Sequence, residues 1–231
     1  MIAGTTTSRS ERAILSAIHK DVLLQWRTRA RFLAVLAFGA TTLLLFSFAV
    51  GPDTAALRRH APGFLWLALL LSSTLALAES FHSELEQRAL EGLLLLPASP
   101  RALFYGKALV NAAQLSAVGV VLVPLTVVLY DTALPRPAGL LGIVVLGAAG
   151  LSAPGTLYAA MSSQARARQT LLPLLLFPLV VPVLLSAVKA TALVTTGDPM
   201  GQLPSWLTLL VCFDAIYWSL CGLLFERVVE E

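Results

Sequence analysis

The sequence predicts an all-α integral membrane protein, a single transmembrane domain of residues 1–231 with six membrane-spanning helices. Two features of the composition predict this fold: 57% of the residues are hydrophobic, and only 13% are charged. The third observation is that the charges lie between long apolar stretches. A helix needs about 20 mainly apolar residues to cross the hydrocarbon core, because lipid offers no partner to exposed backbone N–H and C=O groups.

Six stretches of the chain meet that requirement. We predict spans over residues 32–50, 62–79, 108–130, 139–161, 170–188 and 205–225. Asp214 is the only charged residue in the interior of any of them. The connection from Ala190 to Ser205 contains Pro199 and Pro204, and we expect it to re-enter the membrane or to lie along its outer face.

An amphipathic elbow helix is predicted over about residues 10–30, ahead of the first span. Ser8 and Glu11 fit a capping box at its start. Apolar residues recur at helical spacing, at Leu15, Ile18, Val22 and Trp26. Cations on the other faces of this helix favour a position in the lipid headgroup layer. We therefore predict that membrane lipid is a partner of the chain. The alternative is a soluble cap on the helix bundle.

The distribution of Lys and Arg predicts that both termini face the cytoplasm. Twelve of the 16 Lys and Arg residues lie on the side of the termini, and cytoplasmic loops retain the excess of positive charge. Arg58, Arg59 and His60 lie on the other side and count against this orientation without reversing it. The net charge of +3 reflects this topology, and no Lys/Arg run is interleaved with aromatic residues, so we predict no nucleic-acid partner.

The segment between the second and third spans is predicted to form an amphipathic cytoplasmic helix over about residues 81–96. Its apolar stripe consists of Phe81, Leu85, Ala89, Leu93 and Leu96. On the polar side, Glu84 and Arg88 form an i,i+4 pair with Glu91 nearby. Pro97 ends the helix. We interpret this helix as a docking element for a cytoplasmic partner, and the alternative is an ordinary solvated face.

Prolines and small residues are concentrated in the fourth and fifth spans. Pro154 belongs to the small-residue stretch 147–155, where a neighbouring helix can approach closely. Pro173, Pro178 and Pro182 remove three backbone hydrogen bonds from the fifth span. Such breaks often mark hinges in transporters. We predict that these four prolines are hinges, with kinks needed only for packing as the alternative.

The sequence lacks the common motifs for catalysis and cofactor binding. Arg101 stands where a P-loop ending in Gly106-Lys107 needs its first glycine. His82 and Glu86 are four residues apart, but a zinc site of the helical type needs a second histidine. No G-x-S-x-G motif is present, and all three histidines lie outside the spans, where they cannot ligate haem in the bilayer. We therefore predict that the chain is not an enzyme and binds no metal or cofactor of its own.

Asp214, in the sixth span, is the one intramembrane charge. A carboxylate at that depth is costly and is by default a functional candidate, for a proton path or a substrate contact. The sequence offers no evident acidic or basic partner for it. The alternative is a side chain that is neutral, hydrogen-bonded to a neighbouring helix, or closer to the membrane surface than the span suggests.

Several motifs carry a resemblance to a known family. They are APGFLW (61–66), LALAESFHSELEQRALEGLLLLP (75–97), GK with Asn111 beyond it, SAPG (152–155) and LLPLLLFPLVVPVLL (171–185). In order and placement they resemble the haem exporter protein B (CcmB) family, the permease subunits of the ABC system for cytochrome c maturation. The resemblance runs from about Lys20 to the sixth span.

The resemblance implies a permease of the ABC-2 exporter type in the bacterial inner membrane. It implies that residues 81–96 form a coupling helix in a cleft of a separate ATPase subunit, which holds ATP and Mg. The docking residues implied are Phe81, Glu84, Leu85, Glu86, Arg88, Glu91 and Leu93. Further partners implied are a haem-handling membrane subunit, a periplasmic haem chaperone and a second copy of this chain.

We therefore expect the chain to couple ATP hydrolysis by its partner to haem transport or to the release of a haem-loaded chaperone. One alternative is a permease of the same architecture that exports a lipid or a drug. The other is a membrane scaffold with no transport role, to which ATPase activity would be indifferent.

Overall fold

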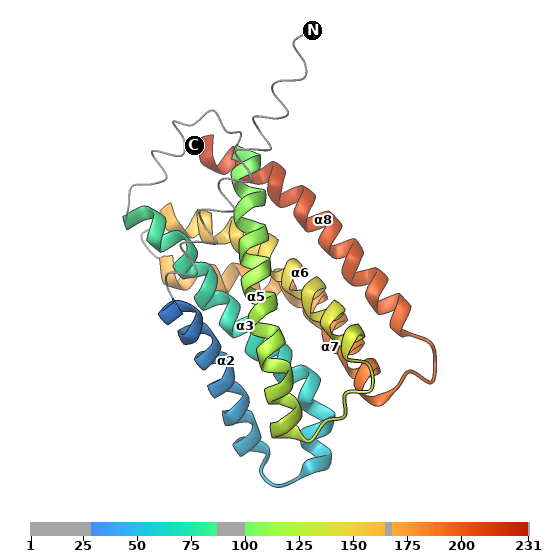
Figure 1. Ribbon diagram of the computed structural model, residues 1–231. Coiled ribbons are helices and arrows are strands. Elements are labelled where there is room, and N and C mark those ends of the chain that lie inside the picture. Colours follow the sequence, from blue (N-terminus) through green and yellow to red (C-terminus); the bar gives the residue numbers. More distant parts are fainter. Residues whose placement is uncertain (1–28, 87–99, 165–167, 231) are drawn as a thin grey trace.

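The computed structural model describes residues 29–86, 100–164 and 168–230, which form six α-helices (Figure 1). The helices are α2 (Arg29–Val50), α3 (Thr54–Glu86), α5 (Pro100–Tyr130), α6 (Pro137–Gln164), α7 (Arg168–Thr196) and α8 (Leu203–Glu230). No strand occurs in these described ranges. All six helices are long and apolar enough to cross a membrane, which confirms the predicted all-α membrane fold.

Each predicted span lies within one helix, and the helices are longer than the spans. α3 begins eight residues before the predicted start at 62, and α5 begins eight residues before 108. The predicted elbow helix, residues 10–30, lies outside the described residues except for its last two positions, which belong to α2.

Successive helices run in opposite directions, so the bundle has two ends (Figure 1). The connections 51–53, 131–136 and 197–202 lie at the lower end in Figure 1, which we call the loop end. α3 ends and α5 begins at the opposite end, which we call the coupling end. α2 and α8 lie at opposite edges of the bundle.

α6 is the centre of the bundle and contacts α3, α5, α7 and α8. Two of its glycines allow α3 to approach closely. A Cβ atom at Gly147 would lie 2.1 Å from Cη2 of Trp66, and one at Gly155 would lie 2.3 Å from Cδ1 of Leu77. A side chain at either position would have to displace Trp66 or Leu77 of α3. This close packing confirms the prediction made from the small residues of the fourth span.

Hydrogen bonds also join the helices inside the bundle. With the donor first, they include Trp66 Nε1 to Thr191 Oγ1 (2.9 Å), Asn111 Nδ2 to Thr156 Oγ1 (2.9 Å), Tyr130 Oη to Leu43 O (2.7 Å) and Trp218 Nε1 to Ala149 O (3.1 Å). In membrane proteins such bonds contribute about 0.6 kcal/mol each on average. Their directionality fixes how each helix is rotated about its axis.

The start of α3 is set by an N-cap. Asp53 Oδ1 accepts hydrogen bonds from the backbone N–H groups of Ala55 and Ala56, both at 3.0 Å. Arg58, Arg59 and His60 therefore lie on the first turns of α3, ahead of the predicted second span.

The expected long connection from Ala190 to Ser205 is wrong, because α7 continues to Thr196 and α8 begins at Leu203. The stretch 190–196 contains neither Pro nor Gly, so nothing interrupts the helix there. Gly197 ends it with φ 98°, and its N–H donates to the carbonyl of Leu193 at 3.1 Å. The remaining connection, 197–202, is too short to enter and leave the membrane.

The four predicted hinge prolines all lie inside helices. Pro154 lies in α6, and Pro173, Pro178 and Pro182 lie in α7, with the backbone helical through each. A proline has no N–H, so the carbonyl four residues earlier receives no helical donor. Their role as hinges stays a prediction.

Candidate functional site

The predicted docking residues divide between described and undescribed parts of the chain. Phe81, Glu84, Leu85 and Glu86 belong to the last turns of α3, so the start of the predicted coupling helix continues the second span without a break. Arg88, Glu91 and Leu93 lie outside the described residues. The docking role of the whole set stays a prediction.

At the coupling end, the first turn of α5 is joined to the last turns of α8. Arg101 Nε donates to Glu226 Oε2 at 2.7 Å, and Arg101 Nη2 lies 2.6 Å from the same oxygen. The two side chains are 49% and 33% exposed, so water screens the pair and it stabilises the fold by about 1 kcal/mol or less. The two residues are 125 positions apart, and no sequence pattern indicated their contact.

An aromatic layer lies next to this ion pair, between the same two helices. The ring centroids of Phe104 and Phe225 are 5.4 Å apart. Tyr105 stacks on Trp218 with centroids 6.3 Å apart and planes at 13°, and its hydroxyl donates to the Trp218 carbonyl at 3.4 Å. Trp218 Nε1 donates in turn to the carbonyl of Ala149 in α6 at 3.1 Å. A single tryptophan of α8 thus contacts both α5 and α6.

Three buried polar residues share one face of α5, namely Lys107, Asn111 and Gln114, which are 3%, 3% and 7% exposed. Their spacings of four and three residues place them on one side of the helix. Asn111 Nδ2 donates to Thr156 Oγ1 of α6 at 2.9 Å. Polar side chains within a membrane domain face the bundle interior and are functional candidates. The site residues predicted from the sequence did not include this face, although the helical spacing of its three residues is visible in the sequence.

Asp214 lies where α8 meets α6 and α7. A Cβ atom at Gly150 of α6 would lie 2.6 Å from Asp214 Oδ1 and 2.8 Å from Cγ1 of Val183 of α7. Both carboxyl oxygens are buried, and no described residue donates a hydrogen bond to either. The interpretation that Asp214 is hydrogen-bonded to a neighbouring helix is therefore wrong within the described part of the chain.

The depth of Asp214 also argues against a position near the membrane surface. It lies eleven residues after the start of α8 at Leu203, which is about 16 Å along the helix axis. A charged carboxylate so placed, without a partner, is costly in lipid. Two interpretations of Asp214 remain. It is a neutral acid, or it is a functional group that acts when the helices move.

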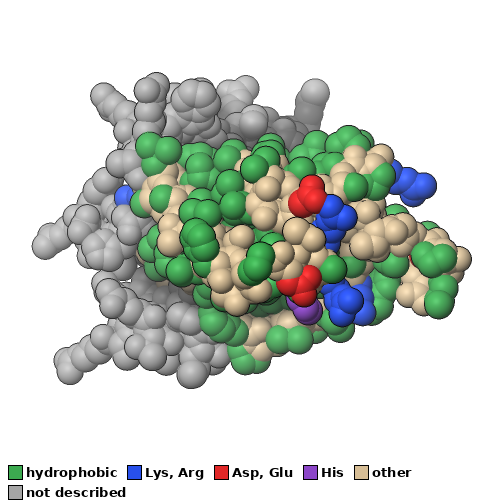
Figure 2. Space-filling view, turned by 90° about the horizontal axis from the view of Figure 1, so that it is seen from below, with side chains coloured by type: hydrophobic (Ala, Val, Ile, Leu, Met, Phe, Trp, Pro, Cys, Tyr) green, Lys and Arg blue, Asp and Glu red, His purple; other side chains and the backbone are tan. Residues whose placement is uncertain are grey.

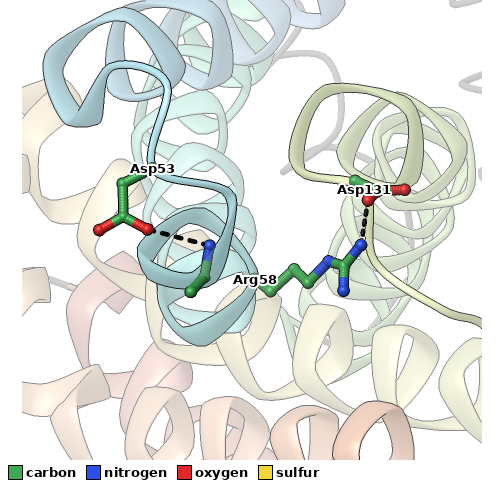
Figure 3. A network of polar contacts seen from close by, with 4 residues as sticks. Asp53, Arg58 and Asp131 are labelled. Carbon is green, nitrogen blue, oxygen red and sulfur yellow. Dashed lines mark hydrogen bonds and ion pairs between the residues drawn. The ribbon is translucent and has the colours of Figure 1, made fainter.

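At the loop end, charged side chains lie among hydrophobic ones (Figure 2). Arg58 of α3 forms an ion pair with Asp131, which directly follows α5 (Figure 3). A depression of about 380 Å³ beside the pair is lined by Arg58, Asp131, Thr132, Ala133, Thr195 and Thr196. Its walls include the C-terminal ends of α5 and α7, whose dipoles favour a cation, and Arg58 supplies one. We interpret this contact as structural, since it joins α3 to α5.

Asp198 closes the connection between α7 and α8. Its Oδ2 accepts from the backbone N–H of Leu203 and its Oδ1 from that of Gln202, both at 2.8 Å. These hydrogen bonds hold the pKa of the Asp198 carboxyl below its usual value of 3.8, because they favour the charged form. Asp198 thus orders the start of α8 in its ionised state.

The chain matches one protein family along nearly its whole length. The model of the family described as CcmB protein matches residues 12–227. Relatives named heme exporter protein B include that of Rhodobacter capsulatus, which is 35% identical over 174 residues, or 75% of this chain and 78% of the relative. Those of Paracoccus denitrificans and Bradyrhizobium diazoefficiens are 33% and 30% identical, over 80% and 82% of this chain and 85% of each relative. Because the family model and these relatives cover most of its residues, the chain belongs to the CcmB family.

Proposed function

We propose that this chain couples ATP hydrolysis by a separate cytoplasmic ATPase to haem transport, or to the release of a haem-loaded periplasmic chaperone. The observation that carries the proposal is the match over residues 12–227, on six membrane-spanning helices, to a family whose relatives are named heme exporter protein B. Family membership makes the chain a membrane permease subunit of the bacterial inner membrane. A lipid or drug permease and a non-transporting scaffold are not favoured, because the relatives bear the haem exporter name.

The ATPase docks on residues 81–96 in this proposal. Support comes from the length of α3, which includes the start of this segment, and of α5, which follows it. α3 has 33 residues and α5 has 31, so at 1.5 Å per residue each is about 45–50 Å long. The hydrocarbon core is about 30 Å thick, so both helices extend beyond it. The extension of α3 to Glu86 carries the first docking residues, Phe81 and Glu84, past the predicted end of the span.

The coupling end faces the cytoplasm in this proposal, and the loop end faces the periplasm. The excess of Lys and Arg on the side of the termini supports this orientation. α2 begins and α8 ends on the same side as the residues assigned to docking (Figure 1). Both termini are therefore assigned to the cytoplasm.

The chain works in this proposal as one part of a complex. ATP and Mg belong to the ATPase subunit, and haem enters as substrate rather than as a resident cofactor. A haem-handling membrane subunit and a periplasmic haem chaperone complete the path, and two copies of the chain face each other so that two coupling helices meet two ATPase subunits. The described residues contain no group of three or more His, Cys, Asp or Glu that could hold a metal ion.

Charge reversal in the docking segment tests this function. Glu84→Lys, Arg88→Glu and Glu91→Lys, combined, should release the ATPase, because each reverses a charge on the polar side of the predicted coupling helix. The measurement is recovery of the ATPase and of a haem-binding membrane protein with the chain purified in detergent. The matched control is Arg59→Glu with Arg136→Glu, two exposed cations at the loop end, which should retain both partners.

Two results would contradict the proposal. Recovery of the ATPase that is equal for the docking variant and the control would overturn docking on residues 81–96. A wild-type preparation that contains neither an ATPase nor a haem-binding membrane protein would overturn the function itself.

A further inference from the structure

The contact between α5 and α8 at the coupling end depends on particular side chains. We call it the α5–α8 clamp, and it consists of Arg101, Phe104 and Tyr105 of α5 with Trp218, Gly222, Phe225 and Glu226 of α8. Phe104 and Phe225 are fully buried in it. A Cβ atom at Gly222 would lie 2.6 Å from Tyr105 Oη and 2.9 Å from Tyr105 Cζ. A side chain at position 222 would displace the Tyr105 ring, so the glycine allows this ring to pack closely against α8.

α8 also packs against α6 and α7, although few of its side chains are buried. It lies at the edge of the bundle (Figure 1), and 17% of its most apolar 18-residue stretch is buried, against 72% for that of α6. The clamp reaches α6 through Trp218, whose Nε1 donates to the carbonyl of Ala149. Asp214, one turn away on α8, packs against Gly150, the next residue of α6. The contacts therefore run without interruption from the first turns of α5 through α8 to the middle of α6.

We propose that Tyr105 and Trp218 are positioning residues that transmit movement of the start of α5 to α8 and α6. This inference rests on the proposed function, because the movement originates in residues 81–96, and only three residues separate this segment from the start of α5 at Pro100. Packed interfaces shift between discrete arrangements rather than deform continuously. An α8 locked to α5 by the clamp moves with it and pulls on α6 near Pro154, one of the predicted hinges.

A pair of glycine substitutions tests the clamp in membranes that contain this chain together with its ATPase and the other maturation proteins. Gly222→Ala places a methyl group against Tyr105, whereas Gly142→Ala in α6 meets no atom within 4 Å. ATP hydrolysis and cytochrome c maturation are measured on the same membranes, and their ratio reports coupling. We expect Gly222→Ala to lower maturation per ATP about tenfold, because the methyl group displaces the Tyr105 ring from Trp218 and overpacking of this kind costs about as much as a tenfold change in rate. Gly142→Ala should leave the ratio unchanged.

Second-site variants separate transmission from simple packing. Tyr105→Phe removes the hydroxyl oxygen, which is the atom nearest to the new methyl group, so adding it to Gly222→Ala should restore part of the lost maturation per ATP. Trp218→Phe keeps a ring against Tyr105 but lacks the Nε1–H that bonds to Ala149, so it should lower the ratio, and Tyr105→Phe should not restore it. Arg101→Glu should be corrected by Glu226→Arg, with a smaller effect because that pair is exposed.

The outcomes that overturn the inference are distinct from those that overturn the function. If the clamp variants lower ATP hydrolysis and maturation in parallel, the clamp only holds the bundle together and transmits nothing. If Gly222→Ala leaves both quantities unchanged, Tyr105 and Trp218 have no role in coupling. Both results leave the proposed function intact, since the ATPase stays bound. A wild-type complex without an ATPase overturns the proposed function, and the inference with it.

Discussion

The three aspartates at the loop end and Asp214 at the contact of α8 with α6 have opposite surroundings. Asp53 caps α3, Asp131 pairs with Arg58, and Asp198 accepts two backbone hydrogen bonds. Asp214 is enclosed by α6 and α7, and no donor from the described residues reaches it. Asp53 and Asp198 stabilise the starts of helices, and Asp131 joins α3 to α5, so each loop-end acid has a structural reason for its presence.

A buried carboxyl without a partner lowers stability, so Asp214 needs another reason. Buried polar groups without a hydrogen-bond partner occur mainly at functional sites, and other interactions in the protein offset the stability that they cost. The position of Asp214 supports such a role, because it lies one turn from Trp218 at the end of the contacts that connect α5 to α6. The contrast therefore separates acids that hold the fold from one that is a candidate for function.

The largest expected effect that tests this contrast is a gain of stability at Asp214. Asp214→Leu keeps the branched shape of the side chain and removes the unpartnered oxygens, so the free energy of unfolding should rise by about 1–3 kcal/mol. Thermal unfolding of the purified chain in detergent measures it. Asp214→Asn keeps the polar atoms and serves as the matched control, with stability close to that of the wild type. If Asp214→Leu loses stability while Asp214→Asn does not, the carboxyl has a partner and the contrast fails.

The next effect is a loss of stability at Asp53. Asp53→Ala removes the acceptor for the N–H groups of Ala55 and Ala56 and should lower the free energy of unfolding by about 1 kcal/mol. Asp53→Ser retains a capping oxygen and should lose much less. The same thermal measurement applies to both, and equal losses would mean that the cap does not set the start of α3.

The architecture was predictable because crossing a membrane imposes one dominant constraint, an apolar stretch of sufficient length. The helix ends were less predictable. Asp53 and Gly197 are ordinary cap residues, and they extend α3 and α7 beyond the predicted spans, whose bounds were set by charges and prolines. A charged residue such as Arg58 can belong to the first turns of a membrane-spanning helix when an oppositely charged residue, here Asp131, pairs with it.

The candidate site was only partly predictable for a different reason. Asp214 was recognisable by its depth in an apolar span, but its lack of a partner depends on what α6 and α7 present to it. Arg101 and Glu226 meet only because α5 and α8 cross at the coupling end. The spacing of Phe81 and Leu85 predicts an apolar stripe, whereas its docking role stays a prediction because the proposed partner is another chain.

A smaller effect is expected from the ion pair of Arg58 with Asp131. Both side chains are more than half exposed, so a double-mutant cycle with Arg58→Gln and Asp131→Asn should give a coupling energy of about 0.2–1 kcal/mol. Salt screens exposed charges, so the coupling should decline as ionic strength rises. A coupling energy that salt does not change would show that the pair is shielded from water and belongs with Asp214 rather than with the other loop-end acids.

The smallest effect is the pH dependence that Asp198 contributes. Backbone hydrogen bonds from Leu203 and Gln202 lower its pKa in the folded chain below 3.8, so the folded state binds its proton less readily than the unfolded state. The stabilisation is therefore fully present above pH 3.8 and is lost as the pH falls through the lowered pKa. Asp198→Asn cannot ionise, so wild type should melt above Asp198→Asn at neutral pH, and the difference in melting temperature should shrink in acid. A difference that stays constant, or grows as the pH falls, would mean that the charge of Asp198 does not hold the start of α8.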